Sequence, residues 1–369
     1  QETGVADPQV LVTSRQATYG ESGVQSAQVP TTLVSVSTRE RWARRVRPFY
    51  VDTGALQAAI EQQARRTNAQ LIHVHWSSGI GMAARRAADA LGLPLVAEVR
   101  FDLAGAVMTE TIRLDLPLLE SVLRRRFERH LNGAAAVVAA SHTLARLVAD
   151  SFPDLDDRLY VVPNGVDLDH FAPDAGVRQA TRARLGLSDA FVVVSTTNML
   201  RYEGLDVLID SAAHLERPIH LLLVGDGTQS ADLESLASKR GVEATFVGRV
   251  PFAEVPGYLS AMDVFAVPRR DASVTRFASP IKAVEAMAMG VPIVASSVGD
   301  LPDLLSDGRG LVIPPGDSPA LCQAIDTLRD EGVRSAIGKR AHDWARVSAS
   351  WSDTVQPYRS AYAHALANR

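Results

Sequence analysis

Residues 277–299 read FASPIKAVEAMAMGVPIVASSVG and predict a loop, a helix and a buried strand in succession. Ser279 suits a helix N-cap, and Pro280 suits the first helical position, where a backbone N–H would have no helical partner. Good helix formers follow over residues 282–289, and Gly290 ends the helix. The apolar run VPIVAS that comes next is typical of a strand covered on both faces. The rest of the chain is placed around this unit.

The start of the expected helix has the composition of an anion site. The backbone N–H groups around Ser279, Pro280 and Ile281 coincide with the positive end of the helix dipole, and Lys282 adds a full charge beside them. Glu285 lies one turn further along, where its carboxylate is able to accept hydrogen bonds from a ribose diol. The combination predicts a site for a sugar nucleotide.

The same stretch resembles the signature of glycosyltransferase family 4. In that family a loop with two glutamates separated by seven residues leads into EAMA.G.PVVAS..GG.PE, and VEAMAMGVPIVASSVGDLPDLL follows it closely here. Glu285 matches the second glutamate, which holds the ribose in the family. Phe277 stands in place of the first, which touches the donor sugar. Residues 279–282 read SPIK and resemble a subset of the family with SPLK in this loop.

The resemblance implies a GT-B fold, with two Rossmann-like, doubly wound α/β domains facing a central cleft. It also implies a retaining glycosyltransferase that needs no metal ion or other cofactor and takes a nucleotide sugar as its donor substrate. UDP is the default nucleotide by family frequency, and the residues do not exclude GDP. The sequence contains no HEXXH-like or cysteine-rich metal pattern, in agreement with this expectation.

Composition sets the class of protein. The chain has 369 residues, enough for two domains, and its 46% hydrophobic and 22% charged content is that of a soluble globular protein. The net charge of −4 argues against a general nucleic-acid binder. The single cysteine, Cys322, excludes an internal disulfide and favours a cytoplasmic location. The composition and the motifs indicate no particular oligomeric state.

Strand-like and helix-like segments alternate along the chain and predict parallel sheets, whose ligands bind beyond the carboxyl ends of the strands. We predict an N-terminal acceptor domain over residues 1–170, a nucleotide-sugar donor domain over 171–350, and a C-terminal helix over 351–369 that returns to the first domain. The segment DRLYVVPNGVDLDHFAP, residues 157–173, resembles the family's domain junction. By the same resemblance, a first strand and a glycine-rich loop are expected before Gln1.

Two segments of the second domain are candidate nucleotide contacts. In residues 245–251, TFVGRVP, the family recognises the base just after the glycine, which assigns this role to Gly248, Arg249 and Val250; an ordinary strand-to-helix turn is the alternative. At residues 198–206, NMLRYEGLD, Glu203 replaces the lysine that usually binds diphosphate. Arg201 and Lys282 are the best substitutes, although a solvated arginine is the alternative for Arg201.

In the first domain, Arg100 occupies the position of a family histidine that approaches the donor sugar. It is a candidate partner for a sugar hydroxyl or the leaving phosphate, and Glu98 or Asp102 are alternative partners for it. His73 and His75 are expected on opposite sides of one strand. His75 is predicted to reach the cleft, and His73 to be a core histidine.

A basic stretch with aromatic residues, RERWARRVRPFY at 39–50, is either a solvated loop, a contact with the inner face of an anionic membrane, or a site for an anionic acceptor. The chain is thus interpreted as a glycosyltransferase that moves a sugar from a nucleotide sugar, by default a UDP-sugar, to an unidentified hydroxyl acceptor. Two alternatives stay open. One is a non-catalytic GT-B subunit that binds nucleotide sugar or a partner, and the other is a sugar-nucleotide hydrolase or epimerase.

Overall fold

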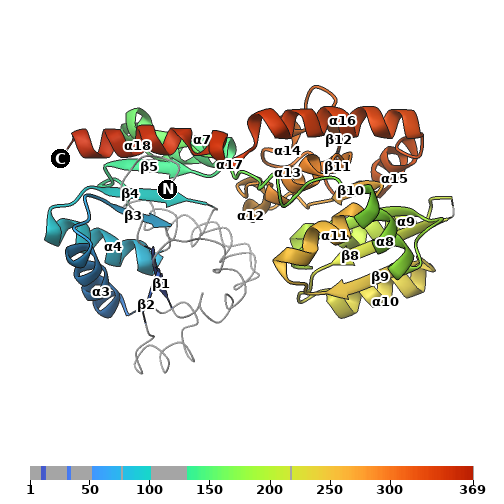
Figure 1. Ribbon diagram of the computed structural model, residues 1–369, viewed down its shortest axis with the longest axis horizontal. Coiled ribbons are helices and arrows are strands. Elements are labelled where there is room, and N and C mark those ends of the chain that lie inside the picture. The colour runs from blue at the N-terminus through green and yellow to red at the C-terminus, as the bar shows by residue number, and fades with distance from the viewer. Residues whose placement is uncertain are drawn as a thin grey trace. The chain divides into compact units, whose positions relative to one another are not determined.

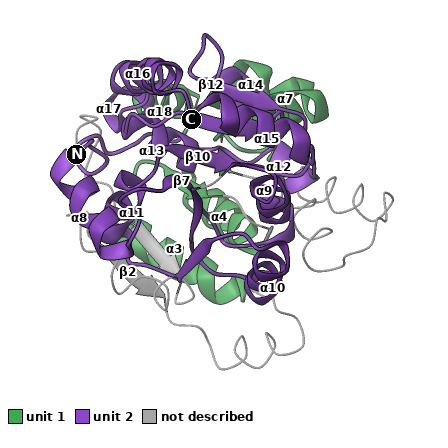
Figure 2. Cartoon of the chain, turned by 90° about the vertical axis from the view of Figure 1, so that its right-hand side faces the viewer, with its two compact units in different colours: residues 1–163, 355–369 green, residues 164–354 purple. Residues whose placement is uncertain are grey.

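The computed structural model describes residues 10–13, 31–34, 52–75, 78–100, 131–216 and 218–368 (Figure 1). The chain divides into two compact units. Unit 1 comprises Gln1–Pro163 and Val355–Arg369, and unit 2 comprises Asn164–Thr354 (Figure 2). The first boundary lies before the predicted 170/171 because the junction belongs to unit 2, where the Val166 amide donates to the Ala349 carbonyl. The cleft expected between the two domains stays a prediction.

Unit 1 is built on a parallel four-stranded sheet of order β3-β4-β5-β6, and β1 pairs with β2 in a separate parallel ladder. The strands are β1 (Val10–Thr13), β2 (Thr31–Val34), β3 (Ile72–His75), β4 (Leu95–Val99), β5 (Ala136–Ala139) and β6 (Leu159–Val161). The helical segments are α3 (Thr53–Arg66), α4 (Ser78–Leu91), α7 (His142–Ser151), η2 (Pro153–Arg158) and α18 (Gln356–Ala367). Every residue of β4 and β5 is buried, as expected for parallel strands covered on both faces.

The C-terminal part of the chain forms two helices where the sequence predicted one. The short α17 (Trp351–Thr354) belongs to unit 2, whereas α18 belongs to unit 1 and packs on β4, β5 and β6 (Figure 1). Trp351 therefore does not accompany α18 into unit 1. Ala361 and Ala365 are completely buried on α18, and their small side chains let the helix lie close to the sheet.

Unit 2 contains a parallel six-stranded sheet of order β12-β11-β10-β7-β8-β9. Its strands are β7 (Phe191–Thr196), β8 (Ile219–Val224), β9 (Ala244–Gly248), β10 (Val264–Val267), β11 (Ile293–Ser296) and β12 (Gly310–Ile313). The chain winds outward from β7 through β8 to β9, then returns to the other side of β7 and continues through β10 and β11 to β12. This is the doubly wound order, and β12, which is short and partly exposed, is the strand that the sequence did not predict.

Helices cover both faces of this sheet. In chain order they are α8 (Ala175–Leu185), η3 (Arg201–Glu203), α9 (Leu205–Ala212), α10 (Ser230–Arg240), η4 (Phe252–Glu254), α11 (Val255–Ser260), α12 (Ser273–Arg276), α13 (Ile281–Ala288), α14 (Leu301–Leu304), α15 (Ser318–Thr327) and α16 (Glu331–Ser348).

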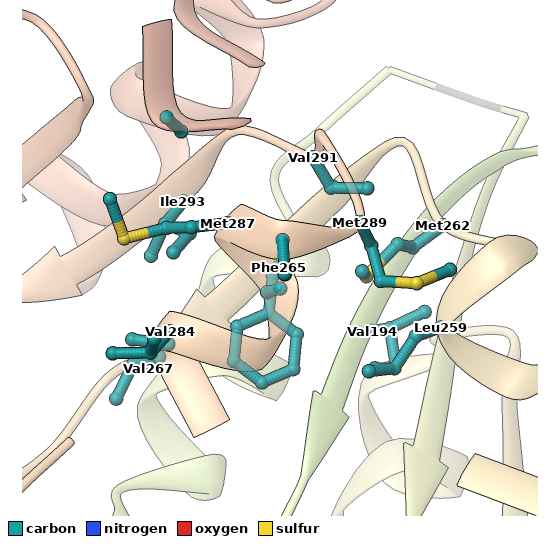
Figure 3. Close-up of a cluster of buried hydrophobic side chains, with 14 of the residues drawn as sticks. Val194, Leu259, Met262, Phe265, Val267, Val284, Met287, Met289, Val291 and Ile293 are labelled. Atoms are coloured by element: carbon teal, nitrogen blue, oxygen red, sulfur yellow. The ribbon is translucent and has the colours of Figure 1, made fainter. Parts of the chain in front are cut away.

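Helix α13 lies in the core of unit 2, and Phe265, Val284 and Met287 belong to the surrounding apolar cluster (Figure 3). It ends as predicted. Gly290 has a φ of +70°, its amide donates to the Met287 carbonyl, and the Val291 amide donates to the Ala286 carbonyl. These are the two hydrogen bonds of a Schellman cap. The predicted loop, helix and buried strand are thus confirmed.

Candidate functional site

The strand order of unit 2 defines where a ligand would bind. The chain leaves β7 toward β8 on one side, and the other half of the sheet begins beside β7 with β10, so the connections diverge at the carboxyl ends of these two strands. Such a switch point leaves a crevice for ligands. A pocket lies here, and it is lined by Ser195, Thr196, Glu203, Phe265, Ala266, Val267, Pro268, Arg269, Pro280, Lys282 and Ala283.

A glycine brings two loops of this site together. Gly204 has a φ of +70°, and a Cβ added there would lie 2.0 Å from the Pro268 carbonyl oxygen. Only glycine, which lacks a Cβ, permits so close an approach between the loop after β7 and the loop after β10. The amide of Arg270 also donates to the Tyr202 carbonyl, at 2.8 Å. This contact carries Glu203 to the side chain of Arg269.

Glu203 is a buried carboxylate shared by two cations. Its Oε2 lies 3.3 Å from Nε of Arg269, and its Oε1 lies 3.8 Å from Nζ of Lys282. Burial would raise the pKa of Glu203, but the charges of Arg269 and Lys282 outweigh it and lower that pKa. Burial lowers the pKa of Lys282, while Glu203 opposes the change. Two positive groups and one negative group leave the pocket with a net positive charge.

The start of α13 differs from the prediction in detail. Pro280, not Ser279, is the N-cap residue, and no side chain caps the helix. The Ile281 amide donates to the Ser279 carbonyl at 3.0 Å, so the expectation of a free amide is wrong for Ile281, and proline has no N–H to offer. Cationic side chains therefore carry more of any anion binding here than backbone amides do.

Glu285 occupies the second turn of α13 and is buried, with 9% of its surface exposed. Burial raises the pKa of its carboxyl to about 7, although the neighbouring charge of Lys282 opposes the rise. Hydrogen-bond donors from a ligand would stabilise the ionised form of this buried carboxyl, because they replace the water that burial removed.

The predicted base-recognition residues lie at the end of β9 and directly after it. Gly248 has a φ of +78°, and nothing lies within 4 Å of a Cβ placed there, so backbone conformation and not crowding requires glycine. Arg249 is exposed, with its Nε 3.7 Å from Oδ2 of Asp226, and Val250 is half-buried. Because β8 separates β9 from β7, this turn lies about 10 Å from the switch point along the sheet edge.

Arg269 is the residue of the pocket that the sequence interpretation missed. Its signal was its place two residues after a buried strand, in VFAVPR, much as other strand ends were singled out. Glu203 was interpreted as a lost phosphate ligand, whereas the structure makes it the partner of both buried Arg269 and half-buried Lys282. Arg201 is exposed at the start of η3, two residues before Glu203.

In unit 1, His75 and Arg100 meet at the carboxyl ends of β3 and β4. Nη1 of Arg100 donates to the Glu98 carboxylate, so the predicted alternative partner is the observed one. The rings of His73 and His75 stack, with centroids 5.6 Å apart and planes 12° apart. Their expected placement on opposite sides of the strand is wrong, because residues two apart on a strand share a face.

Some predictions fall outside the described residues, namely the basic segment 39–50 and the candidate partner Asp102. Among the residues that are described, no cluster of three or more histidine, cysteine or acidic side chains is arranged to hold a metal ion. No helix in the described part of the chain has the length and apolar character needed to cross a membrane.

Two parallel α/β units, the second with a cationic pocket at its switch point, define the GT-B class of glycosyltransferases. One family model, described as Glycosyltransferase Family 4, matches residues 10–170, and another, described as Glycosyl transferases group 1, matches residues 190–331. A D-inositol 3-phosphate glycosyltransferase of Nocardia farcinica is 30% identical over 329 residues, which cover 83% of this chain and 69% of the relative. The chain belongs to glycosyltransferase family 4.

Other similar proteins differ in the substrates that their names state. A GDP-mannose-dependent alpha-(1-6)-phosphatidylinositol monomannoside mannosyltransferase of Mycolicibacterium smegmatis is 33% identical over 247 residues. That match covers 64% of this chain and 63% of the relative, so the chain spans less than two thirds of the relative's length. The crystal structure of Anabaena HepE with UDP-glucose has a TM-score of 0.73 at 20% identity and covers 97% of this chain and 92% of HepE, a likeness of fold.

Proposed function

We propose that the chain is a retaining, metal-independent glycosyltransferase that moves a sugar from a nucleotide sugar to a hydroxyl acceptor. One observation carries the proposal. At the switch point of unit 2, Arg269 and Lys282 share buried Glu203, and buried Glu285 follows one turn along α13. This arrangement combines a cationic pocket for a diphosphate with a carboxylate for a ribose diol.

Each part of the donor has a place along the carboxyl edge of the sheet. Arg269 and Lys282 bind the diphosphate, and exposed Arg201 adds a further positive charge from the loop after β7. Glu285 accepts hydrogen bonds from the ribose, and the turn at Gly248 contacts the base. The spacing of about 10 Å between β7 and β9 suits an extended nucleotide, since two strand separations are about the length of a nucleoside with one phosphate.

The chemistry follows from this placement. The sugar–phosphate bond breaks, the diphosphate leaves with the bonding electrons, and the acceptor hydroxyl attacks on the face that the diphosphate leaves, which retains the anomeric configuration. The cations at Lys282 and Arg269 stabilise the negative charge that develops on the leaving group. The departing phosphate oxygen takes the acceptor's proton. On unit 1, His75 and Arg100 are the proposed contacts to the sugar or the acceptor.

Glu203 also bears on the alternative of a non-catalytic subunit. Its replacement of a phosphate-binding lysine was one motive for that alternative. Because Glu203 holds two other cations at the same pocket, the exchange supports a rebuilt diphosphate site and not a lost one.

Calorimetry without added metal tests the donor site and identifies the nucleotide. UDP and GDP are both titrated, because the named relatives divide between GDP-mannose and UDP-glucose. We expect one of them to bind in the micromolar range and to bind about 10-fold or more weakly to Lys282→Gln, the loss expected for a charge-assisted bond. Lys239→Gln, an exposed lysine on α10, is the control and keeps wild-type affinity. Failure of both nucleotides to bind would refute the proposal.

A further inference from the structure

Unit 1 contains a buried carboxylate that the donor site does not use. Glu98 lies on β4 with 1% of its side chain exposed, and it is surrounded by polar groups from three elements. His73 and His75 reach it from β3, Arg100 from the residue after β4, and Tyr358 from α18. We call these five residues the Glu98 cluster.

The two oxygens of Glu98 have different partners. Oε2 accepts a hydrogen bond of 2.6 Å from the Tyr358 hydroxyl and lies 3.1 Å from Nε2 of His73. The other ring nitrogen of His73, Nδ1, lies 2.7 Å from the Tyr362 hydroxyl. These contacts hold the carboxylate from the side of α18. Oε1 faces the opposite way, toward Nδ1 of His75 at 3.4 Å and the guanidinium of Arg100.

The carboxylate is ionised. Burial would raise the pKa of Glu98, but the hydrogen bond from His73, the charge of His75 and the hydrogen bond from Tyr358 lower it to about 2. An ionised oxygen accepts hydrogen bonds and cannot donate one. An ionised Oε1 at 3.4 Å from Nδ1 favours the tautomer of neutral His75 that carries its proton on Nδ1 and leaves Nε2 unprotonated.

The side chain of His75 is accessible. The side chain of His75 is 65% exposed, in contrast to the 18% exposure of His73 beside it. His75 ends β3, and Arg100 follows β4, so both lie at the carboxyl edge of a parallel sheet, where ligands of doubly wound folds bind. In the Nδ1-protonated tautomer, Nε2 of His75 would be an acceptor of hydrogen bonds at this edge.

We propose that Glu98 is a positioning residue that fixes His75 in the Nδ1-protonated form, so that Nε2 accepts a hydrogen bond from a hydroxyl of the sugar or the acceptor. This role rests on the proposed transferase function. Tyr358 holds Glu98 in turn, which makes the C-terminal helix α18 a part of the site. The helix contributes no residue to the substrate contact; it orients the carboxylate that orients His75.

The test reads the tautomer of His75 directly. Long-range ¹H–¹⁵N spectra of protein labelled with ¹⁵N-histidine distinguish the two ring nitrogens, and the His75 signal is assigned by its loss in His75→Gln. We expect the Nδ1-protonated form in the wild type and a shift toward the Nε2-protonated form in Glu98→Gln. Tyr358→Phe, which removes one hydroxyl and leaves Glu98 in place, shifts the population in the same direction. An Nε2-protonated His75 in the wild type, or no change in Glu98→Gln, would overturn the proposal.

Kinetics separate this proposal from the proposed function. With the donor nucleotide identified, Tyr358→Phe should lower kcat for transfer about 10-fold, as for other residues that orient a ligating histidine, and leave the affinity for the nucleoside diphosphate unchanged. Tyr160→Phe is the control, because Tyr160 also contacts α18, through His364, but lies outside the Glu98 cluster. We expect this variant to keep wild-type kcat. Unaltered transfer by Tyr358→Phe would overturn the positioning role. Failure of the wild type to bind either nucleotide would refute the proposed function and leave the control of the His75 tautomer by Glu98 standing, since the tautomer is measured without substrate.

Discussion

Replacement of Glu285 by glutamine should stabilise the fold and weaken the donor site at once. The free-energy cost of burying the charge of Glu285 is given by the shift of its pKa from the ordinary value. The pKa of Glu285 rises from its ordinary value of 4.5 to about 7, so the native state holds the proton more tightly than the unfolded chain does. A raised native pKa means that stability is fully present below pH 4.5 and is lost as the pH rises through 7.

The size of the effect follows from the same two values. The two pKa values differ by about 2.5, and each pKa unit corresponds to about 1.4 kcal/mol. At pH 8 the ionised Glu285 therefore destabilises the native state by about 3 kcal/mol. At pH 5, where the native carboxyl is nearly all protonated, the loss is only about 1 kcal/mol. Glutamine has the same shape and no charge. We therefore expect Glu285→Gln to raise the free energy of unfolding by about 3 kcal/mol at pH 8 and by about 1 kcal/mol at pH 5.

Urea unfolding at both pH values measures this difference. Glu234→Gln is the matched control, because Glu234 is exposed on α10 and its replacement should change stability by less than about 0.5 kcal/mol. An equal effect of Glu285→Gln at pH 5 and pH 8 would show that packing and not charge causes the change, and would refute the reasoning.

Nucleotide binding gives the second half of the prediction. If the ionised carboxylate accepts two hydrogen bonds from the ribose, its neutral replacement loses about 1 kcal/mol for each bond, about 30-fold in affinity. In the wild type, affinity should rise about 10-fold between pH 6 and pH 8 as Glu285 ionises, beyond any rise seen in Glu285→Gln. Calorimetry at the two pH values measures both. Equal pH dependence in the two proteins would refute the assignment of Glu285 to the ribose.

Three further predictions concern the same pocket. Lys282→Ala should lower kcat for transfer more than it lowers affinity for the donor, because the charge of Lys282 acts mainly on the leaving group. A loss of donor affinity with an unchanged kcat would contradict this. Glu203→Ala should lower the free energy of unfolding by about 3 to 5 kcal/mol in urea, because Arg269 and Lys282 lose their buried partner, and a loss below about 1 kcal/mol would contradict the ion-pair interpretation. Gly204→Ala should destabilise the protein by about 2 kcal/mol more than Gly186→Ala, since both glycines have a positive φ but only Gly204 meets another backbone; equal changes in melting temperature would argue against the close approach.

The elements of the fold follow from local patterns in the sequence. The run VPIVAS, the small and apolar residues of α13 and the glycine after it are signals that lie within about 20 residues of one another. They predicted the helix, its end and the next strand correctly. The start of α13 was less predictable, because Ser279 and Pro280 are both good residues for a helix start and only the observed backbone separates their roles.

The partners within the site are decided by tertiary structure. Glu203 and Arg269 are 66 residues apart, and they meet because the sheet order places β10 beside β7 and because Gly204 lets the two loops touch. Glu98 and Tyr358 are 260 residues apart, and their hydrogen bond depends on where α18 packs. Local periodicity shows which face of an element is buried but not which element covers it. The sequence by itself thus determined the class of fold and the helix that carries Lys282 and Glu285, whereas only the tertiary structure decided which charges hold one another in place.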